Sequence, residues 1–146
     1  MQDTSSETTA TGGWKLPLVI FTLAHTVGTV HSTAVTVMVP VIKDFYDVPY
    51  TAVAFLITSY SIGQTVFSIP NGNMIDRIGV RNGLLVSHGV LLGAAILLFY
   101  AANIWFAYLA LFLMGWGYSA INPATAKGVF QSFSEKRRAT AMGIKQ

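Results

Sequence analysis

The stretch Gly72-Asn-Met-Ile-Asp76-Arg77-Ile-Gly79-Val-Arg81 holds the only charged side chains between residues 48 and 126. It separates two uncharged runs, 48–75 and 82–126. Each run is longer than the about 20 apolar residues that a helix needs to cross a bilayer. The stretch is therefore predicted to be a loop at the membrane surface, between two transmembrane helices.

The composition supports a membrane protein. Hydrophobic residues make up 53% of the chain, charged residues make up 10%, and the mean hydropathy is +0.55. A soluble domain of 146 residues would need more polar side chains to cover its surface.

The uncharged runs predict how many times the chain crosses the bilayer. A third run, 16–42, is long enough for one helix. The run 82–126 would be roughly 67 Å long as a single helix, about twice the hydrocarbon thickness, so it must fold back. Ala101-Ala-Asn103 is the natural turn. The prediction is an all-α membrane protein with transmembrane helices at about 16–42, 50–71, 82–101 and 104–129.

Lysine and arginine predict the orientation, because cytoplasmic loops carry an excess of both. Only Lys43 falls on the outer side of these four helices. The inner side would carry Lys15, Arg77, Arg81, Lys127, Lys136, Arg137, Arg138 and Lys145. We therefore expect a multi-pass protein of the cell membrane with a cytoplasmic N-terminus, a disordered cytoplasmic tail at 1–13, and no nucleic-acid partner.

The charged loop has two interpretations when it is taken alone. Gly72 permits a close helix exit, Asp76 can accept backbone N–H groups, and Gly79 supplies backbone freedom. Arg77 and Arg81 would lie at the level of the lipid headgroups. One interpretation is a tight cytoplasmic hairpin with basic anchors, but the spacing of these residues is more specific than such a hairpin requires.

The spacing G-x-x-x-D-R-x-G-x-R resembles the signature loop of the major facilitator superfamily of secondary transporters, with a departure at Val80. A second stretch resembles the fourth helix of that superfamily and the entry to its fifth, and is closest to branches that carry anions or organic acids. Its residues are Gly115-Trp-Gly-Tyr-Ser119-Ala-Ile-Asn122-Pro123-Ala-Thr-Ala-Lys127, followed by Phe133, Arg138, Ala141, Met142 and Gly143. The acid usual beside the basic residue of this loop is not at Arg137, and Glu135 is its nearest replacement.

The resemblance implies a 12-helix transporter made of two six-helix halves, with the solute bound near the midplane between them. The halves would rock in alternating access, and Asp76 would latch against the other half, with Arg77 and Arg81 in its charge network. The present chain would be an amino-terminal fragment: helices one to four and the start of a fifth at 138–146. Its partners would be the lipid bilayer, a small-molecule substrate and the rest of its own chain.

Polar residues within the helices are candidates for the substrate cavity. Thr22, Thr26, Thr29, Thr33 and Thr36 share one face of the first helix, and His25 borders them. Such hydroxyl groups also bond their own helix or neighbouring helices, so a packing role competes with cavity lining. The other candidates are Tyr60, Gln64, Tyr118 and Asn122.

Three smaller interpretations concern packing and charge. The small-residue pairs Gly115/Ser119 and Gly89/Gly93 are expected to let helices approach closely. Lys127 is expected to extend to the headgroups rather than attract an anion. If transport is coupled to an ion, His25 is the one candidate coupling residue in this part of the chain.

Other classes of function are less well supported. No cysteine is present, and no nucleophile, metal cluster or phosphate loop is evident, so no cofactor and no enzymatic activity are expected. A complete four-helix exporter acting as a dimer would need an embedded ionisable residue. A non-transporting membrane scaffold would give no reason for the signature loop. The substrate, the coupling ion and the direction of transport are left open.

Overall fold

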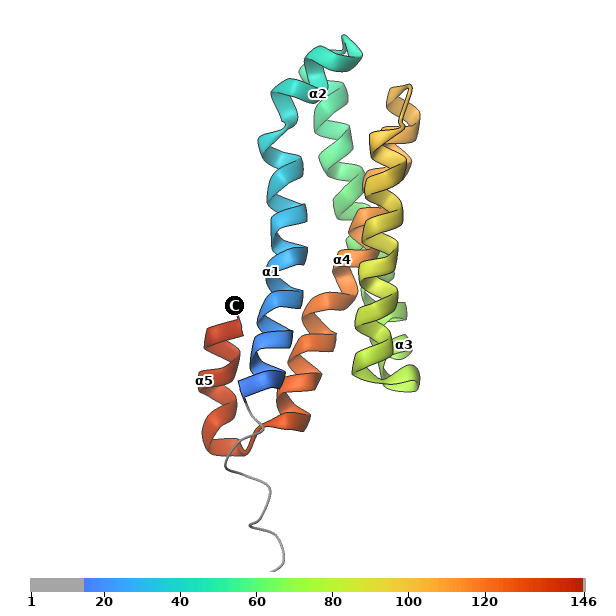
Figure 1. Ribbon diagram of the computed structural model, residues 1–146. Helices are drawn as coiled ribbons and strands as arrows, with labels where there is room; N and C mark the ends of the chain where they lie inside the picture. The colour runs from blue at the N-terminus through green and yellow to red at the C-terminus, as the bar shows by residue number, and fades with distance from the viewer. Residues whose placement is uncertain (1–14, 146) are drawn as a thin grey trace, which may run out of the picture.

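A computed structural model describes residues 15–145 (Figure 1). The described chain forms five helices and no strand: α1 (Lys15–Val37), α2 (Val39–Tyr46), α3 (Tyr50–Phe99), α4 (Ile104–Ser132) and α5 (Glu135–Lys145). Helices α1, α3 and α4 are long and apolar enough to cross a membrane. The predicted all-α membrane fold is confirmed. The predicted disordered tail at 1–13 lies outside the described residues.

The first predicted helix, 16–42, is in fact divided at Met38. Pro40 is the physical cause, because it has no N–H to donate to the carbonyl group one turn earlier and it disfavours helical geometry at the preceding residue. The short helix α2 then carries the chain across one end of the bundle to Asp47, which adopts a left-handed conformation with φ 48°.

Helix α3 is a hairpin of two antiparallel membrane helices. The chain reverses at Gly79, whose φ of 83° and ψ of 167° are not helical. Sequence analysis predicted a ten-residue loop at 72–81, but the first arm remains helical up to this glycine, so most of the signature residues lie on a helix. No residue from Gly72 to Ile78 has a positive φ, and Gly79 alone supplies the backbone conformation that the reversal needs.

The turn between α3 and α4 ends at Asn103, whose side chain caps the N-terminus of α4. The Asn103 Oδ1 atom accepts hydrogen bonds from the backbone N–H groups of Trp105 at 3.1 Å and Phe106 at 3.3 Å. These donors belong to the first turn of α4 and would otherwise have no partner.

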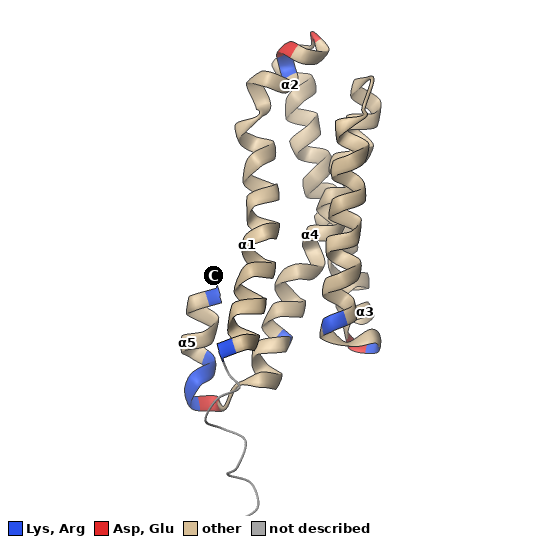
Figure 2. Cartoon of the chain, viewed as in Figure 1, with Lys and Arg blue, Asp and Glu red and all other residues tan. Residues whose placement is uncertain are grey.

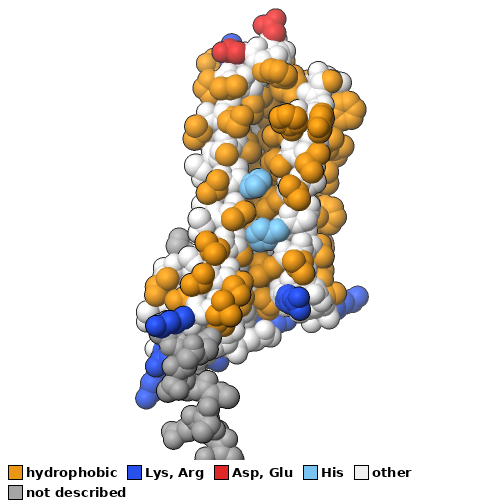
Figure 3. Space-filling model, in the orientation of Figure 1, with side chains coloured by type: hydrophobic (Ala, Val, Ile, Leu, Met, Phe, Trp, Pro, Cys, Tyr) orange, Lys and Arg blue, Asp and Glu red, His pale blue; other side chains and the backbone are white. Residues whose placement is uncertain are grey.

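The charged residues, apart from Lys145, lie toward the two ends of the bundle (Figure 2). The basic residues cluster where α1 begins, where α3 reverses and where α4 meets α5. At the opposite end, Lys43 donates a hydrogen bond of 3.1 Å to Asp44, which raises the pKa of Lys43. Between the ends the surface is largely apolar, as Figure 3 shows for one face. The separation of charge fits a membrane-spanning bundle.

Lys145 is an exception to the predicted charge distribution. Sequence analysis placed it with the basic residues at the cytoplasmic end. It is instead the last residue of α5, eleven residues beyond the turn, and its side chain is buried against the bundle. The prediction was wrong because α5 folds back along α1 and α4, as Figure 1 shows, instead of staying at the surface.

Helices α3 and α4 pack with their backbones in contact. A Cβ atom on Gly63 would collide with the backbone of Phe112, and one on Gly115 would collide with the Tyr60 carbonyl oxygen. The expected close approach at Gly115 is therefore present. Gly89 and Gly93, the other small-residue pair, have nothing within 4 Å of the position of an added Cβ, so that pair makes no close contact within residues 15–145.

Candidate functional site

The threonine stripe of α1 is mostly exposed. Thr26, Thr29 and Thr33 line a groove of about 540 Å³, together with His25 and apolar neighbours. Thr36 is also exposed, whereas Thr22 lies half-buried closer to the start of the helix. The Thr29 hydroxyl donates to the His25 carbonyl oxygen at 3.0 Å. The stripe thus forms an open polar surface, and at least one of its hydroxyl groups is used within its own helix.

Three polar atoms of the predicted cavity are buried without a hydrogen bond among residues 15–145. They are Thr22 Oγ1, His25 Nδ1 and Tyr60 Oη. Ser32 of α1 lies near the Tyr60 hydroxyl, but the pair does not have the geometry of a hydrogen bond. A buried polar group without a partner costs about 1–3 kcal/mol. These atoms are therefore suited to binding something that residues 15–145 do not supply.

Tyr60, Tyr118 and Gln64 lie where α3 and α4 face α1. The Tyr60 and Tyr118 rings are 6.1 Å apart, and the Tyr118 ring lies beside Gly28 of α1. Gln64 is half-buried, and its backbone lies against Gly115. The structure thus brings these predicted cavity residues together near the middle of the bundle.

Asn122 has a partner that sequence analysis missed. The Lys145 Nζ atom donates a hydrogen bond of 2.7 Å to Asn122 Oδ1. The Lys145 residue is 1% exposed, while Asn122 remains exposed. The spacing within α5 could have predicted that Lys145 is buried. Lys145 follows the buried Ala141 by four residues, so the two residues share one face of the helix.

The signature hairpin is tied to α4 by an ion pair. Asp76 Oδ1 and Lys127 Nζ are 2.5 Å apart. Lys127 was expected to extend to the headgroups, and Arg77 and Arg81 were expected in the Asp76 charge network. Within residues 15–145 neither arginine forms an ion pair, and both are exposed. The reason is geometric, since α3 stays helical to Ile78 and presents Asp76 to α4.

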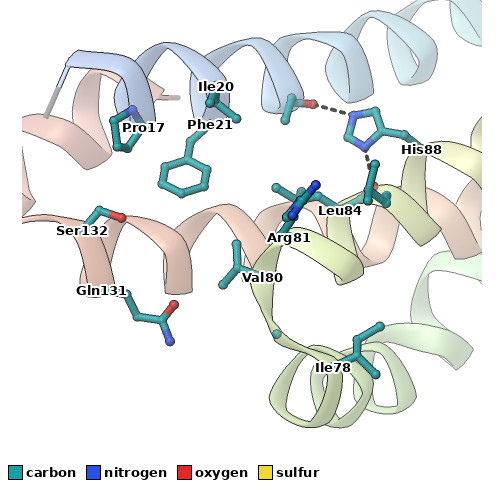
Figure 4. A pocket seen from close by; sticks show the side chains of 13 residues that line it. Pro17, Ile20, Phe21, Ile78, Val80, Arg81, Leu84, His88, Gln131 and Ser132 are labelled. Atoms are coloured by element: carbon teal, nitrogen blue, oxygen red, sulfur yellow. Dashed lines mark hydrogen bonds between the residues drawn. The ribbon is translucent and has the colours of Figure 1, made fainter. Parts of the chain in front are cut away.

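Gly79 and Arg81 also border a crevice of about 730 Å³ between α1, the α3 hairpin and the end of α4 (Figure 4). Its lining is mostly apolar. At one side His88 bridges two helices: Nδ1 is 2.8 Å from the Leu84 carbonyl oxygen, and Nε2 is 3.3 Å from the Ala24 carbonyl oxygen of α1. His88 thus connects the second arm of α3 to α1. Gly72, the first signature residue, has open space around it.

A buried polar cluster between α3 and α4 was not predicted. Asn71, which is 2% exposed, donates to the Trp116 carbonyl oxygen at 2.9 Å and to Ser119 Oγ at 2.6 Å. The Trp116 indole N–H donates back to Asn71 Oδ1 at 3.2 Å. The one feature of the sequence that could have predicted this cluster is an asparagine inside an apolar run, directly after Pro70. Both side-chain N–H groups and the side-chain oxygen of Asn71 thus bond to α4, so the cluster contributes to the contact between α3 and α4.

No group of three or more metal-ligating side chains occurs in the part of the chain that the structure describes.

Residues 20–146 match the family model of the Major Facilitator Superfamily. The chain belongs to the major facilitator superfamily. Searches of curated proteins and of solved structures find no match. Membership in the superfamily and the apolar helices support a multi-pass membrane protein with a general role in transport, and they point to a transporter and not to an enzyme.

Proposed function

We propose that this chain belongs to a secondary active transporter that moves a small polar solute, an organic or inorganic anion, by alternating access. The carrying observation is the polar face of α1. Its threonines open on a groove, and the buried Thr22, His25 and Tyr60 atoms have no hydrogen-bond partner among residues 15–145. A solute that supplies the missing partners would stabilise them.

The distribution of charge favours an anion. Apart from Asp76 at the hairpin, the described membrane helices α1, α3 and α4 contain no Asp or Glu. Lys145, by contrast, is a cation on α5, the helix that packs against both α1 and α4. An anion entering this region meets attractive charge and no carboxylate repulsion from these helices.

We infer that the cavity is completed by the remainder of the transporter chain, and that the N-terminus of α1 faces the cytoplasm in the cell membrane. The cluster of basic side chains at that end of the bundle supports this orientation (Figure 2). In the inferred cycle, the solute binds between α1 and the facing half of the transporter.

Asp76 is the proposed conformational latch. Its ion pair with Lys127 holds the hairpin to α4, and both side chains remain partly exposed, at 69% and 32%. An exposed pair of this kind contributes only about 0–1 kcal/mol to stability. It can therefore exchange partners during transport, and we propose that Asp76 does so with the other half.

The test compares Asp76→Asn with Asp47→Asn in the protein expressed from its native reading frame. Asp47 is an exposed acid at the opposite end of the bundle. We expect Asp76→Asn to reduce the rate of solute uptake into proteoliposomes about tenfold or more, with little change in the amount of folded protein in the membrane. Asp47→Asn should change neither quantity. Equal loss of uptake and of folded protein in Asp76→Asn would overturn the latch and favour a purely structural hairpin.

A further inference from the structure

Lys145 is a buried cation with an incomplete set of partners. Its residue is 1% exposed, and its one hydrogen bond in the described chain goes to Asn122 Oδ1 at 2.7 Å. An ammonium group carries three N–H donors. No carboxylate pairs with it among residues 15–145. A buried charge in this state is strongly destabilising unless a further partner compensates it.

Two polar groups of α1, one of the helices that α5 contacts, also lack a hydrogen-bond partner among the described residues. Helix α5 packs against both α1 and α4. On α1, the Nδ1 atom of His25 is buried without a hydrogen bond among residues 15–145. The Thr22 hydroxyl lies three residues earlier on the same face and is likewise without a partner among the described residues.

Asn122 connects the buried ammonium group of Lys145 to the surface of the described chain. Its side-chain oxygen orients the ammonium group, and the residue itself is exposed on α4. Helix α5 also packs against α1, where His25 and Thr22 carry buried polar atoms that have no hydrogen bond among the described residues. Each of these side chains can donate to an oxygen atom, and Lys145 contributes a full positive charge.

We propose that Lys145, Asn122 and His25 form the binding site for the negatively charged group of the solute, a carboxylate or a small inorganic oxyanion. The inference rests on the proposed transport function and names its charge-recognising residues. Lys145 pairs with the anion, Asn122 holds the ammonium group in place, and His25 and Thr22 complete the hydrogen bonds to the anion oxygens. The alternative partner for Lys145 is a carboxylate from another part of the protein.

The experiment measures the thermal stability of the purified protein, expressed from its native reading frame, with sodium acetate, sodium oxalate or sodium phosphate. Sodium chloride at equal ionic strength is the reference. We expect at least one of the three anions to raise the Tm beyond the chloride reference. In Lys145→Met the concentration needed for half of that rise should increase about tenfold or more. Lys145→Arg should retain part of the effect, because the charge is kept.

Two further variants separate anion binding from a structural role. Lys136→Met changes an exposed lysine of the same helix and should keep the full anion effect. Asn122→Asp would give Lys145 an internal carboxylate partner, so it should raise the Tm without added anion and abolish the anion effect. This variant also tests the site if Lys145→Met does not fold.

The inference is overturned if none of the three anions protects the protein, if Lys145→Met is protected like the unmodified protein, or if Asn122→Asp retains the anion effect. Solute uptake into proteoliposomes distinguishes this failure from failure of the proposed function. If uptake is unchanged in Lys145→Met, the proposed transport function stands and the proposed anion site is wrong. If the unmodified protein takes up no solute, both the proposed transport function and the proposed anion site are wrong.

Discussion

The contact of α3 with α4 and the free face of α1 are built in opposite ways. Between α3 and α4, glycines bring the backbones together, and Val53, Leu56, Leu111 and Met114 fill a buried apolar core. Along α1, Gly28 is the only fully buried residue, and threonine hydroxyl groups face an open groove. The first region is closely packed, with backbone against backbone at Gly63 and Gly115.

The difference assigns separate tasks to the two regions. In a bilayer, close helix packing depends on van der Waals contact between small residues, because lipid tails are as apolar as the side chains. The α3–α4 contact meets that requirement at Gly63 and Gly115. The polar face of α1 is less favourable against lipid than an apolar face would be, which supports the proposed contact of this face with solute.

The largest expected loss of stability comes from adding a side-chain atom where the backbones of α3 and α4 are in contact. In Gly115→Ala the new Cβ meets the Tyr60 carbonyl oxygen and the Gln64 backbone N, neither of which can rotate away. We expect destabilisation of about 3 kcal/mol or more, at the upper end of the range for overpacking. The measurement is the Tm of the protein in detergent. Gly93→Ala, where open space awaits the methyl group, should leave the Tm unchanged or raise it.

The hairpin of α3 should be the next most sensitive position. Gly79 has φ 83° and ψ 167°, a conformation that is almost restricted to glycine. Gly79→Ala is expected to cost about 1–3 kcal/mol through backbone strain, although nothing lies within 4 Å of the added Cβ. Gly72→Ala is the matched control, since this glycine also has open space but no positive φ. Equal Tm values for the two variants would contradict the assigned reversal.

Removal of the buried asparagine should have a somewhat smaller effect. Asn71→Leu deletes the hydrogen bonds to Trp116 and Ser119 and leaves their polar atoms without this partner. We expect a loss of about 1–2 kcal/mol in stability. Asn73→Leu changes an exposed residue two positions away and should have little effect on the Tm. A neutral Asn71→Leu would show that the cluster contributes nothing to the α3–α4 contact.

The smallest effect on stability is expected on the face of α1. Thr26→Val and Thr33→Val replace exposed hydroxyl groups of the groove, so each should change stability by less than about 0.5 kcal/mol. If these residues contact solute, the KM for uptake should nevertheless rise. A drop in Tm as large as that of Asn71→Leu would instead assign them to packing.

The sequence was sufficient to predict the features that depend on local chemistry. Uncharged runs longer than the bilayer thickness predicted the membrane helices, and the spacing from Gly72 to Arg81 pointed to the correct superfamily. The division at Met38 was missed, although Pro40 is a known helix breaker, because membrane helices often contain proline.

Partners that are distant along the chain could not be predicted. Asp76 and Lys127 are 51 residues apart, and only the packing of α3 on α4 shows that they meet. From the sequence, Lys145 is predicted to be a basic residue near the membrane surface. The structure shows instead that α5 folds back and packs against α1. Helical spacing places residues on a face, but it does not reveal which helix lies opposite that face.

Chemical labelling of single cysteines tests most directly whether the face of α1 lines an aqueous path. The chain has no cysteine of its own, so Thr29→Cys and Leu92→Cys each introduce one thiol into it, on the groove and on the exposed apolar side of α3 respectively. A membrane-impermeant charged methanethiosulfonate, which reacts with thiols in water, should modify Thr29→Cys rapidly in membranes and leave Leu92→Cys largely unmodified. Equal protection of both thiols would contradict the account.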